Sequence, residues 1–318
     1  MIMKRIFASI LAAAMMLSLV ACGGGDKPAA STPAASTPAA STPAASTPAA
    51  STPAAPAEKD YSTMTIDELK AELTTLEAGK LTVATSPDFA PYEFYAIDDN
   101  SNAALAGFEM SLAQHIADFI GLELEVVTMD FDGTLNELGA KAVDLGMAGY
   151  SPKPEREALM DFSDIFYTGG QSFVCLEANK DLFPDLASAN KAEYSIGAQT
   201  GSIQLDLANE NTPDADIVSL PKVTDIVAEL VTGKLDGAFV ETVVAQSYKT
   251  NYPELCVVLP VPYEQEGSVV GVYKGNEALL AAVNLAIADA LESGAMDDYV
   301  ATANELASGN IHEGLLEG

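Results

Sequence analysis

The chain has 318 residues, of which 46 are acidic and 15 basic, so its formal net charge at pH 7 is −31. Such a strongly acidic protein is repelled by nucleic acid, and we exclude nucleic acid as a partner. The only histidines, His115 and His312, stand near no cysteine and near no second histidine, so neither a metal nor any other cofactor is expected.

The first 21 residues have the composition of an export signal. Lys4 and Arg5 precede an uncharged run, residues 6–21, that is too short for a comfortable membrane span. The run ends in Leu-Val-Ala directly before Cys22, which resembles the lipobox of bacterial lipoproteins. The resemblance implies that residues 1–21 are a signal peptide that is removed. It also implies that Cys22 carries lipid, including palmitate, which anchors the protein in the cell membrane on the extracytoplasmic side.

Residues 22–57 form a predicted linker behind that anchor. They are rich in Ala, Ser, Thr and Pro and include five copies of Ser-Thr-Pro-Ala-Ala, which start at Ser31, Ser36, Ser41, Ser46 and Ser51. A segment without large apolar side chains cannot bury a core, and regular prolines favour an extended spacer. The remaining residues, 58–318, are enough for one large domain or two smaller lobes.

The first half of residues 58–318 alternates between helices and strands. The capping-box sequence Thr65-Ile66-Asp67-Glu68 predicts a helix that continues to Gly79. The elements expected after it are a strand (80–85), a loop through Pro87 and Pro91, a helix (108–120), a strand (122–127), a helix (134–140) and a strand (143–148). This alternation predicts a parallel sheet flanked by helices.

A second set of elements repeats the pattern of the first. It consists of predicted strands at 172–176, 194–198, 217–220 and 237–240 with helices at 202–208 and 223–232. Strands at 256–260 and 268–273 follow, and helices at 278–291 and 296–306 are expected to return to the first lobe. We therefore predict an α/β protein with two lobes, each a mostly parallel sheet, in which 58–170 and 264–318 form lobe 1, 171–263 form lobe 2, and two segments cross between them.

Arg156 is an isolated cation in this acidic chain, and it follows a predicted strand end, where α/β sheets bind ligands. Its planar guanidinium can bind a carboxylate through two hydrogen bonds. Ser151 offers a hydroxyl in the same segment. Considered alone, an arginine next to Glu155 and Glu157 is as easily explained as a solvated residue at the start of a helix.

Four sequence motifs in order point to a known family: Phe89-Ala90-Pro91-Tyr92-Glu93-Phe94, Gly107-Phe108-Glu109, Gly149-Tyr150-Ser151-Pro152-Lys153-Pro154-Glu155-Arg156 and Asp161-Phe162-Ser163-Asp164-Ile165-Phe166-Tyr167. From about residue 80 to about residue 306, the chain resembles the family-3 extracellular solute-binding proteins, the amino-acid receptors of ABC importers. The resemblance implies the type II periplasmic-binding-protein fold, which agrees with the two lobes predicted above.

The resemblance also implies a ligand site. Arg156 would bind the ligand carboxylate, helped by Ser151 in the motif that Gly149 opens, and by Ser202 and the backbone N–H of Ile203 at a helix start. Where the family usually has an aspartate for the ligand ammonium, this chain has Glu241. The expected aromatic lining consists of Phe89, over the ligand side chain, together with Tyr92 or Tyr150.

The predicted function is capture of an amino acid and its delivery to an ABC permease, by a protein that is expected to be a monomer and not an enzyme. A polar or basic amino acid is favoured. Two alternatives stay open: a cyclohexadienyl dehydratase-like enzyme, acting on arogenate or prephenate with Glu241 as general acid, and a ligand sensor without transport. Cys175 and Cys256 can be free thiols or a disulfide.

Overall fold

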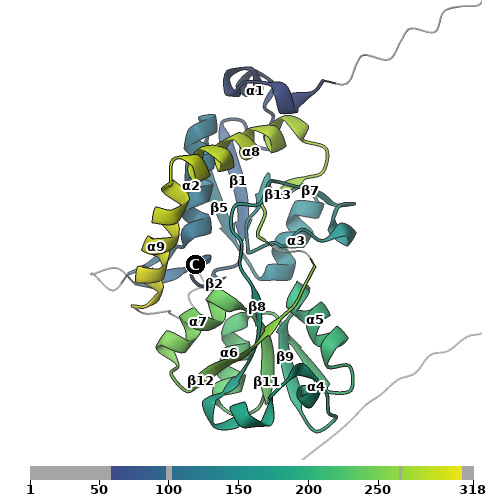
Figure 1. Ribbon diagram of the computed structural model, residues 1–318. Helices are drawn as coiled ribbons and strands as arrows, with labels where there is room; N and C mark the ends of the chain where they lie inside the picture. Colours follow the sequence, from purple (N-terminus) through teal and green to yellow (C-terminus); the bar gives the residue numbers. More distant parts are fainter. Residues whose placement is uncertain (1–58, 98–101, 265–266, 310–318) are drawn as a thin grey trace, which may run out of the picture. The chain divides into compact units, whose positions relative to one another are not determined.

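The computed structural model describes residues 59–97, 102–264 and 267–309. The predicted signal peptide, Cys22, the whole of the predicted linker and His312 lie outside these residues. The described chain forms two lobes, each with one five-stranded sheet flanked by helices (Figure 1). This arrangement confirms the predicted two-lobed α/β fold class.

The sheet of the first lobe combines strands from both ends of the described chain. Its order is β5 (Glu123–Thr128), β1 (Lys80–Thr85), β6 (Leu145–Gly146), β13 (Gly271–Tyr273) and β7 (Met160–Phe162). β1 runs parallel to both of its neighbours, whereas β13 runs antiparallel to β6 and β7. β1 is almost completely buried, because helices cover both faces of the sheet.

The sheet of the second lobe has the same plan. Its order is β10 (Asp216–Leu220), β9 (Ser195–Gln199), β11 (Gly237–Glu241), β8 (Gln171–Leu176) and β12 (Leu255–Val261). The first three strands are parallel, and β8 runs antiparallel to both β11 and β12. The two sets of elements that the sequence predicted therefore form two sheets with the same topology.

The chain crosses between the lobes twice, once between β7 and β8 and once between β12 and β13. The two crossing segments pair through an isolated antiparallel bridge between Tyr167 and Ser268. A pair of neighbouring segments of this kind can act as a hinge.

The helices of the first lobe pack against its sheet and against one another. They are α1 (Ile66–Glu72), α2 (Phe108–Ile120), α3 (Phe131–Gly139), α8 (Glu277–Glu292) and α9 (Ala295–Ala307), preceded by the 3-10 helix η1 (Tyr61–Thr63). Leu112 and Ile116 of α2 share one fully buried core with Leu279 and Val283 of α8. Among the described helices, none alone is long and apolar enough to span a membrane; α8 and α9 meet that condition only together, across a bend of 78°.

The second lobe contains α4 (Leu186–Ala189), α5 (Ile203–Asn211), α6 (Val223–Val231) and α7 (Thr242–Asn251), with the 3-10 helix η3 (Glu177–Leu182). A cluster of aromatic rings fills one side of its sheet, where Phe173 contacts Phe183 and Phe239 edge to face. Cys175 and Cys256 are directly opposite each other on β8 and β12, and both are free thiols. The free-thiol alternative is therefore the one that the structure shows.

Several element boundaries differ from the predictions. α1 ends at Glu72 and not at Gly79, because the backbone turns extended at Leu73 and the N–H of Leu76 bonds the Asp144 carboxylate. The predicted loop after β1 contains a small antiparallel sheet of β2 (Asp88–Phe89), β3 (Glu93–Ile97) and β4 (Ala103–Ala106).

Two further differences concern the ends of strands. The predicted strand at 268–273 is shortened to β13, because Ser268 belongs to the hinge pair. Helix α7 was not predicted, since it follows β11 without any intervening turn residue.

Candidate functional site

The predicted site residues lie where the two lobes meet. In each lobe they follow the carboxyl ends of parallel strands: β1 and β6 in the first lobe, β9 and β11 in the second. Loops at these ends are the usual ligand-binding positions of α/β sheets. Because both sets face the lobe boundary, residues that are far apart in the sequence become neighbours.

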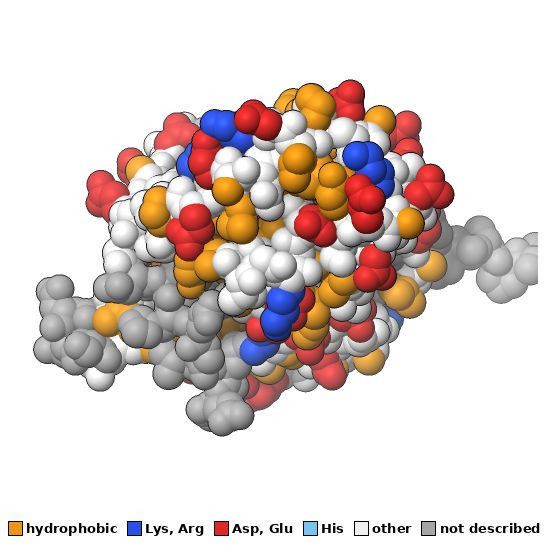
Figure 2. Space-filling model, turned by 90° about the horizontal axis from the view of Figure 1, so that it is seen from below, with side chains coloured by type: hydrophobic (Ala, Val, Ile, Leu, Met, Phe, Trp, Pro, Cys, Tyr) orange, Lys and Arg blue, Asp and Glu red, His pale blue; other side chains and the backbone are white. Residues whose placement is uncertain are grey.

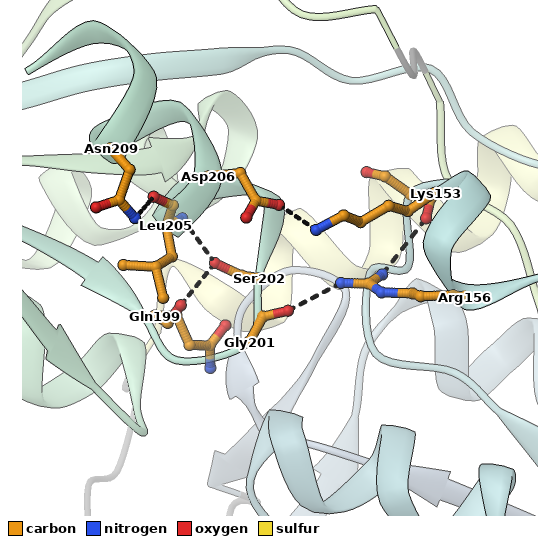
Figure 3. A network of polar contacts seen from close by, with 9 residues as sticks. Lys153, Arg156, Gln199, Gly201, Ser202, Leu205, Asp206 and Asn209 are labelled. Atoms are coloured by element: carbon orange, nitrogen blue, oxygen red, sulfur yellow. Dashed lines mark hydrogen bonds and ion pairs between the residues drawn. The ribbon is translucent and has the colours of Figure 1, made fainter. Parts of the chain in front are cut away.

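Arg156 ends the 3-10 helix η2 (Pro154–Arg156) and is only 7% exposed. Its Nη1 donates to the carbonyl oxygen of Ser151 at 3.4 Å, and its Nη2 donates across the boundary to the carbonyl oxygen of Gly201 at 3.0 Å (Figure 3). The guanidinium also lies over the rings of Phe131 and Tyr150, at 5.6 and 5.9 Å from their centroids. Burial lowers the pKa of Arg156, yet guanidinium remains charged at any physiological pH.

The partners of Arg156 are neutral. Among the described residues, the guanidinium forms no ion pair with a carboxylate, although 46 acidic residues are present in the chain. The interpretation of Arg156 as a solvated residue paired with its neighbours is therefore wrong. Its positive charge is buried at the lobe boundary and is bound there by backbone carbonyls and aromatic faces.

Ser202 is the N-cap of α5, directly after Gly201. Its hydroxyl donates to the carbonyl oxygen of Gln199 at 2.7 Å and accepts from the N–H of Leu205 at 3.3 Å (Figure 3). Ile203 is the first residue of the helix, so its N–H is among those that the helix itself leaves without a partner. The positive end of α5 therefore lies beside Arg156, and both features favour an anion.

A second cation and a carboxylate bridge the lobes next to Arg156. Lys153 of the first lobe forms an ion pair with Asp206, which lies on α5 (Figure 3). These two residues, with Ile203 and Tyr263, line a groove along the boundary. The side chain of Asp206 is about half exposed, so the pair adds little to stability.

Phe89 and Tyr92 belong to a cluster of buried aromatic rings in the first lobe. Their ring centroids are 5.2 Å apart, and Tyr92 also packs against Phe108 and Tyr167. Gly149 approaches the Phe89 ring so closely that an added Cβ would lie 2.6 Å from Cε1. Gly149 also has φ of +62°, a conformation that only glycine adopts readily, so the sequence requires glycine here for two reasons.

Glu241 ends β11 and is the N-cap of α7. Its Oε2 accepts the N–H of Val244 at 2.9 Å, and its Oε1 accepts the N–H of Gly170, in the hinge, at 3.2 Å. The side chain is 4% exposed, and this burial raises the pKa of Glu241 to about 7. The pKa of Tyr92 is raised mainly by burial and, to a smaller extent, by the negative charge of Glu241.

Asp88 is a boundary residue that the sequence reasoning missed. Its carboxylate, on β2, accepts hydrogen bonds from the N–H of Val223 and from Nε2 of Gln199, both in the second lobe. The hydroxyl of Tyr248 donates to the backbone carbonyl of Asp88 at 2.8 Å. The one available signal was position, because Asp88 follows a strand end just as Arg156 does.

Figure 2 shows one outer face of the molecule, seen from below. In the view of Figure 2, acidic side chains are spread over the face between apolar and uncharged groups. On the described part of this face the basic side chains form no continuous surface.

Taken together, the boundary offers a guanidinium with a helix N-terminus on one side and a buried carboxyl group with aromatic rings on the other. This arrangement is complementary to a small molecule that carries both a carboxylate and an ammonium.

Comparisons with known proteins show what the chain resembles. The model of the family described as bacterial extracellular solute-binding proteins, family 3, matches residues 81–302. The arginine-binding extracellular protein ArtP of Bacillus subtilis is 34% identical over 202 residues, which are 62% of this chain and 76% of ArtP. Cyclohexadienyl dehydratase of Pseudomonas aeruginosa is 26% identical over 185 residues, which are 58% of this chain and 68% of that enzyme.

A solved structure shows the same architecture. The amino acid ABC transporter substrate-binding protein AbpA of Streptococcus pneumoniae, bound to L-arginine, superposes with a TM-score of 0.70 at 29% identity. The match covers 77% of this chain and 100% of AbpA.

Proposed function

Because the chain belongs to the family 3 bacterial extracellular solute-binding proteins, we propose that it captures an amino acid between its two lobes and delivers it to an ABC importer. The family is extracellular, and the protein therefore acts on the extracytoplasmic side. In this proposal the ligand is held by the residues at the lobe boundary: Phe89, Tyr92, Gly149, Ser151, Arg156, Ser202, Ile203 and Glu241.

The observation that carries the proposal is the buried, unneutralised charge of Arg156. A buried cation is costly unless an anion or strong hydrogen bonds compensate for it. Two neutral carbonyl groups compensate only in part. A ligand α-carboxylate would replace the Gly201 carbonyl as the partner of Nη2 and would also meet the N-terminus of α5.

Glu241 supplies the opposite end of the site in this proposal. A ligand ammonium next to its buried carboxyl group would favour the ionised form and lower its pKa from about 7. Glutamate has one methylene more than the aspartate usual in the family, and its side chain folds back to cap α7. The ammonium would then bind between this carboxylate and the Tyr92 hydroxyl.

The proposed ligand is a basic or polar amino acid, with L-arginine the first candidate. ArtP is named as arginine-binding, and AbpA was solved with L-arginine. The acidic net charge of this chain also attracts cationic solutes in general.

The membrane arrangement is part of the same proposal. Residues 1–21 would be removed as a signal peptide, Cys22 would carry the lipid, and residues 22–57 would separate the lobes from the membrane. Residues 58–170 and 264–318 would form lobe 1, and 171–263 lobe 2. The partner would be the permease of an ABC importer, which receives the ligand from a monomer.

Calorimetry on two matched variants tests the site. Arg156→Ala should abolish measurable binding of L-arginine, because it removes the carboxylate partner. Lys153→Ala removes a neighbouring cation that is already paired with Asp206. The affinity of this variant for L-arginine should stay within about threefold of that of the unmodified chain. Equal affinity of Arg156→Ala and the unmodified chain would reject the assigned site.

One observation favours a second candidate, a dehydratase of cyclic carboxylates. Burial raises the pKa of Glu241 to about 7, which suits a general acid, and cyclohexadienyl dehydratase is among the relatives. Turnover of prephenate or arogenate that is lost in Glu241→Gln would establish this activity. Absence of turnover together with tight amino-acid binding would exclude the dehydratase and support only the receptor function.

A further inference from the structure

Two glutamates are buried together behind the proposed site. Glu93 lies on β3, Glu109 in the first turn of α2, and both are 0% exposed. The backbone brings them together, since the N–H of Glu109 donates to the carbonyl of Tyr92 at 3.0 Å. Gly107 makes this approach possible, because a Cβ there would lie 2.0 Å from the same carbonyl oxygen.

The two carboxyl groups are each other's main polar partners. Neither oxygen of Glu93, nor Oε1 of Glu109, has an N–H or O–H donor elsewhere in the described part of the chain. The two carboxyl groups lie within hydrogen-bonding reach of each other. Two buried carboxylates in such contact repel each other strongly, so one of them retains a proton and donates it to the other. Burial, followed by the charge of Glu109, raises the pKa of Glu93, which makes Glu93 the proton donor.

The second oxygen of Glu109 holds a segment of the binding site. Its Oε2 accepts the N–H of Gly149 at 3.0 Å. Gly149 is the residue that packs against the Phe89 ring, and it begins the segment that continues to the Ser151 carbonyl, a partner of Arg156. The chain of contacts thus runs from the buried pair to four of the proposed ligand-binding residues, Gly149, Phe89, Ser151 and Arg156.

We propose that Glu109, with a proton shared from Glu93, is a positioning residue that fixes the N–H of Gly149 and thereby orders the segment 149–151 for ligand binding. This inference rests on the proposed function, because it assigns the segment a role in binding. A charged acceptor forms a stronger hydrogen bond than a neutral one. A segment that is already ordered loses less entropy when the ligand binds.

The neighbouring titratable groups do not provide another proton donor in this position. The negative charge of Asp88 raises the pKa of Glu93, so Asp88 acts there as a charge and not as a proton donor. The negative charge of Glu109 also raises the pKa of Tyr92 and of Tyr150. Their hydroxyls have other partners, however: that of Tyr92 bonds Ser268, and that of Tyr150 bonds Thr134. Burial raises the pKa of Glu109 itself to about 7. Its ionisation therefore falls in a range that solution measurements reach easily.

The direct test follows the Gly149 amide by NMR in the chain from Gly23 to Gly318, which lacks the lipidation cysteine. Its chemical shift should titrate with a midpoint near pH 7 in the unmodified chain and in Glu93→Gln, where an amide replaces the proton donor. It should not titrate with that midpoint in Glu109→Gln. A Gly149 amide whose shift and titration are the same in Glu109→Gln as in the unmodified chain would overturn the proposal, because Glu109 would then not be the partner of this N–H.

Affinity for L-arginine supplies the second readout. Glu109→Gln keeps an acceptor for the Gly149 N–H and should bind within about threefold of the unmodified chain. Glu109→Leu has similar bulk and no acceptor, and should bind about tenfold more weakly, because a buried N–H then lacks its partner. Equal affinities of the Gln and Leu variants would contradict positioning. If the unmodified chain binds no amino acid, the proposed function fails, while the Gly149 titration still decides the role of the pair.

Discussion

The carboxylate of Asp88 in the first lobe accepts a hydrogen bond from the backbone N–H of Val223, the first residue of α6 in the second lobe. The same carboxylate also accepts from Gln199 and from the Ser86 hydroxyl, and Asp88 is 4% exposed. One side chain therefore connects the end of β1 to two elements of the other lobe. The ionisation of Asp88 should therefore affect the stability of these contacts between the two lobes.

Asp88→Asn should alter the dependence of stability on pH. Burial raises the pKa of Asp88 to about 6, so the folded state favours the protonated form more than the unfolded state does. This contribution to stability is complete below the unfolded pKa, about 3.9, and is lost as pH rises through 6. Asparagine is neutral throughout. From pH 4 to pH 7.5, the free energy of unfolding of Asp88→Asn should therefore gain up to about 3 kcal/mol relative to the unmodified chain.

Urea denaturation of both proteins across this range measures the difference. If the two stability curves stay parallel from pH 4 to pH 7.5, Asp88 does not carry the raised pKa that its burial implies.

Ligand affinity should weaken below pH 7 through Glu241. Burial raises its pKa to about 7 without ligand, and an ammonium partner would keep it ionised in the complex. Binding at pH 6 should then release close to one proton, and the dissociation constant should rise up to about tenfold from pH 7 to pH 6. Calorimetry at pH 6 in buffers with different ionisation enthalpies counts the protons.

Glu241→Gln is the matched variant for this measurement, because it keeps the cap of α7 without an ionisable group. It should release no proton and bind more weakly at pH 8. Proton release that persists in this variant would assign the effect to another group.

Gly149→Ala should damage the site without removing any charge or hydrogen-bonding side chain. The added Cβ would lie 2.6 Å from the Phe89 ring and would also strain a backbone with φ of +62°. We expect the affinity for L-arginine to fall more than tenfold, with about 1–3 kcal/mol of lost stability. Gly275→Ala is the control, since φ there is +88° but nothing lies within 4 Å of the added Cβ. Similar losses of affinity in both variants would show that backbone strain, not contact with Phe89, explains the effect.

Cys175 should be unreactive in the native protein, although Cys256 lies opposite it. Burial raises the pKa of the Cys175 thiol to about 12, and thiols react as thiolates. Iodoacetamide should label neither cysteine quickly without denaturant and both in guanidinium, as intact mass would show. A mass lower by two hydrogens, with no labelling after denaturation, would mean that the disulfide forms.

The sequence predicted most strands of the two five-stranded sheets, because strands covered on both faces leave short apolar runs between helices. It missed β7, an edge strand of only three residues. It failed at residues 86–106, where Pro87 and Pro91 suggested a loop, although prolines can flank short strands at a sheet edge. Helix α7 was missed for a different reason. Glu241 ends a strand and caps the helix at once, so no turn residue separates the two.

The candidate site was predictable only where a motif supplied it. Arg156 was proposed from its position after a predicted strand end, and Glu241 from its match to the aspartate that is usual in the family. The pairing of Asp88 with Val223 depends on how two lobes close, which no local pattern encodes. Glu109 did leave a trace: it lies three residues before Leu112 and seven before Ile116, on the apolar face of its helix. An acidic residue on such a face indicates a buried polar role.

The most direct test of amino-acid capture is a thermal-shift comparison of three related compounds with the chain from Gly23 to Gly318. L-Arginine has both charged ends, agmatine lacks the α-carboxylate, and Nα-acetylarginine lacks the α-ammonium. A ligand that binds the folded state raises the melting temperature, and at equal concentration the tighter ligand raises it more, because the stabilisation grows with the logarithm of ligand concentration over Kd. We predict a clear rise with L-arginine, or with another amino acid of a full panel, and none with the analogue that lacks its carboxylate or ammonium. Equal shifts with agmatine and L-arginine, or no shift with any amino acid, would contradict the account.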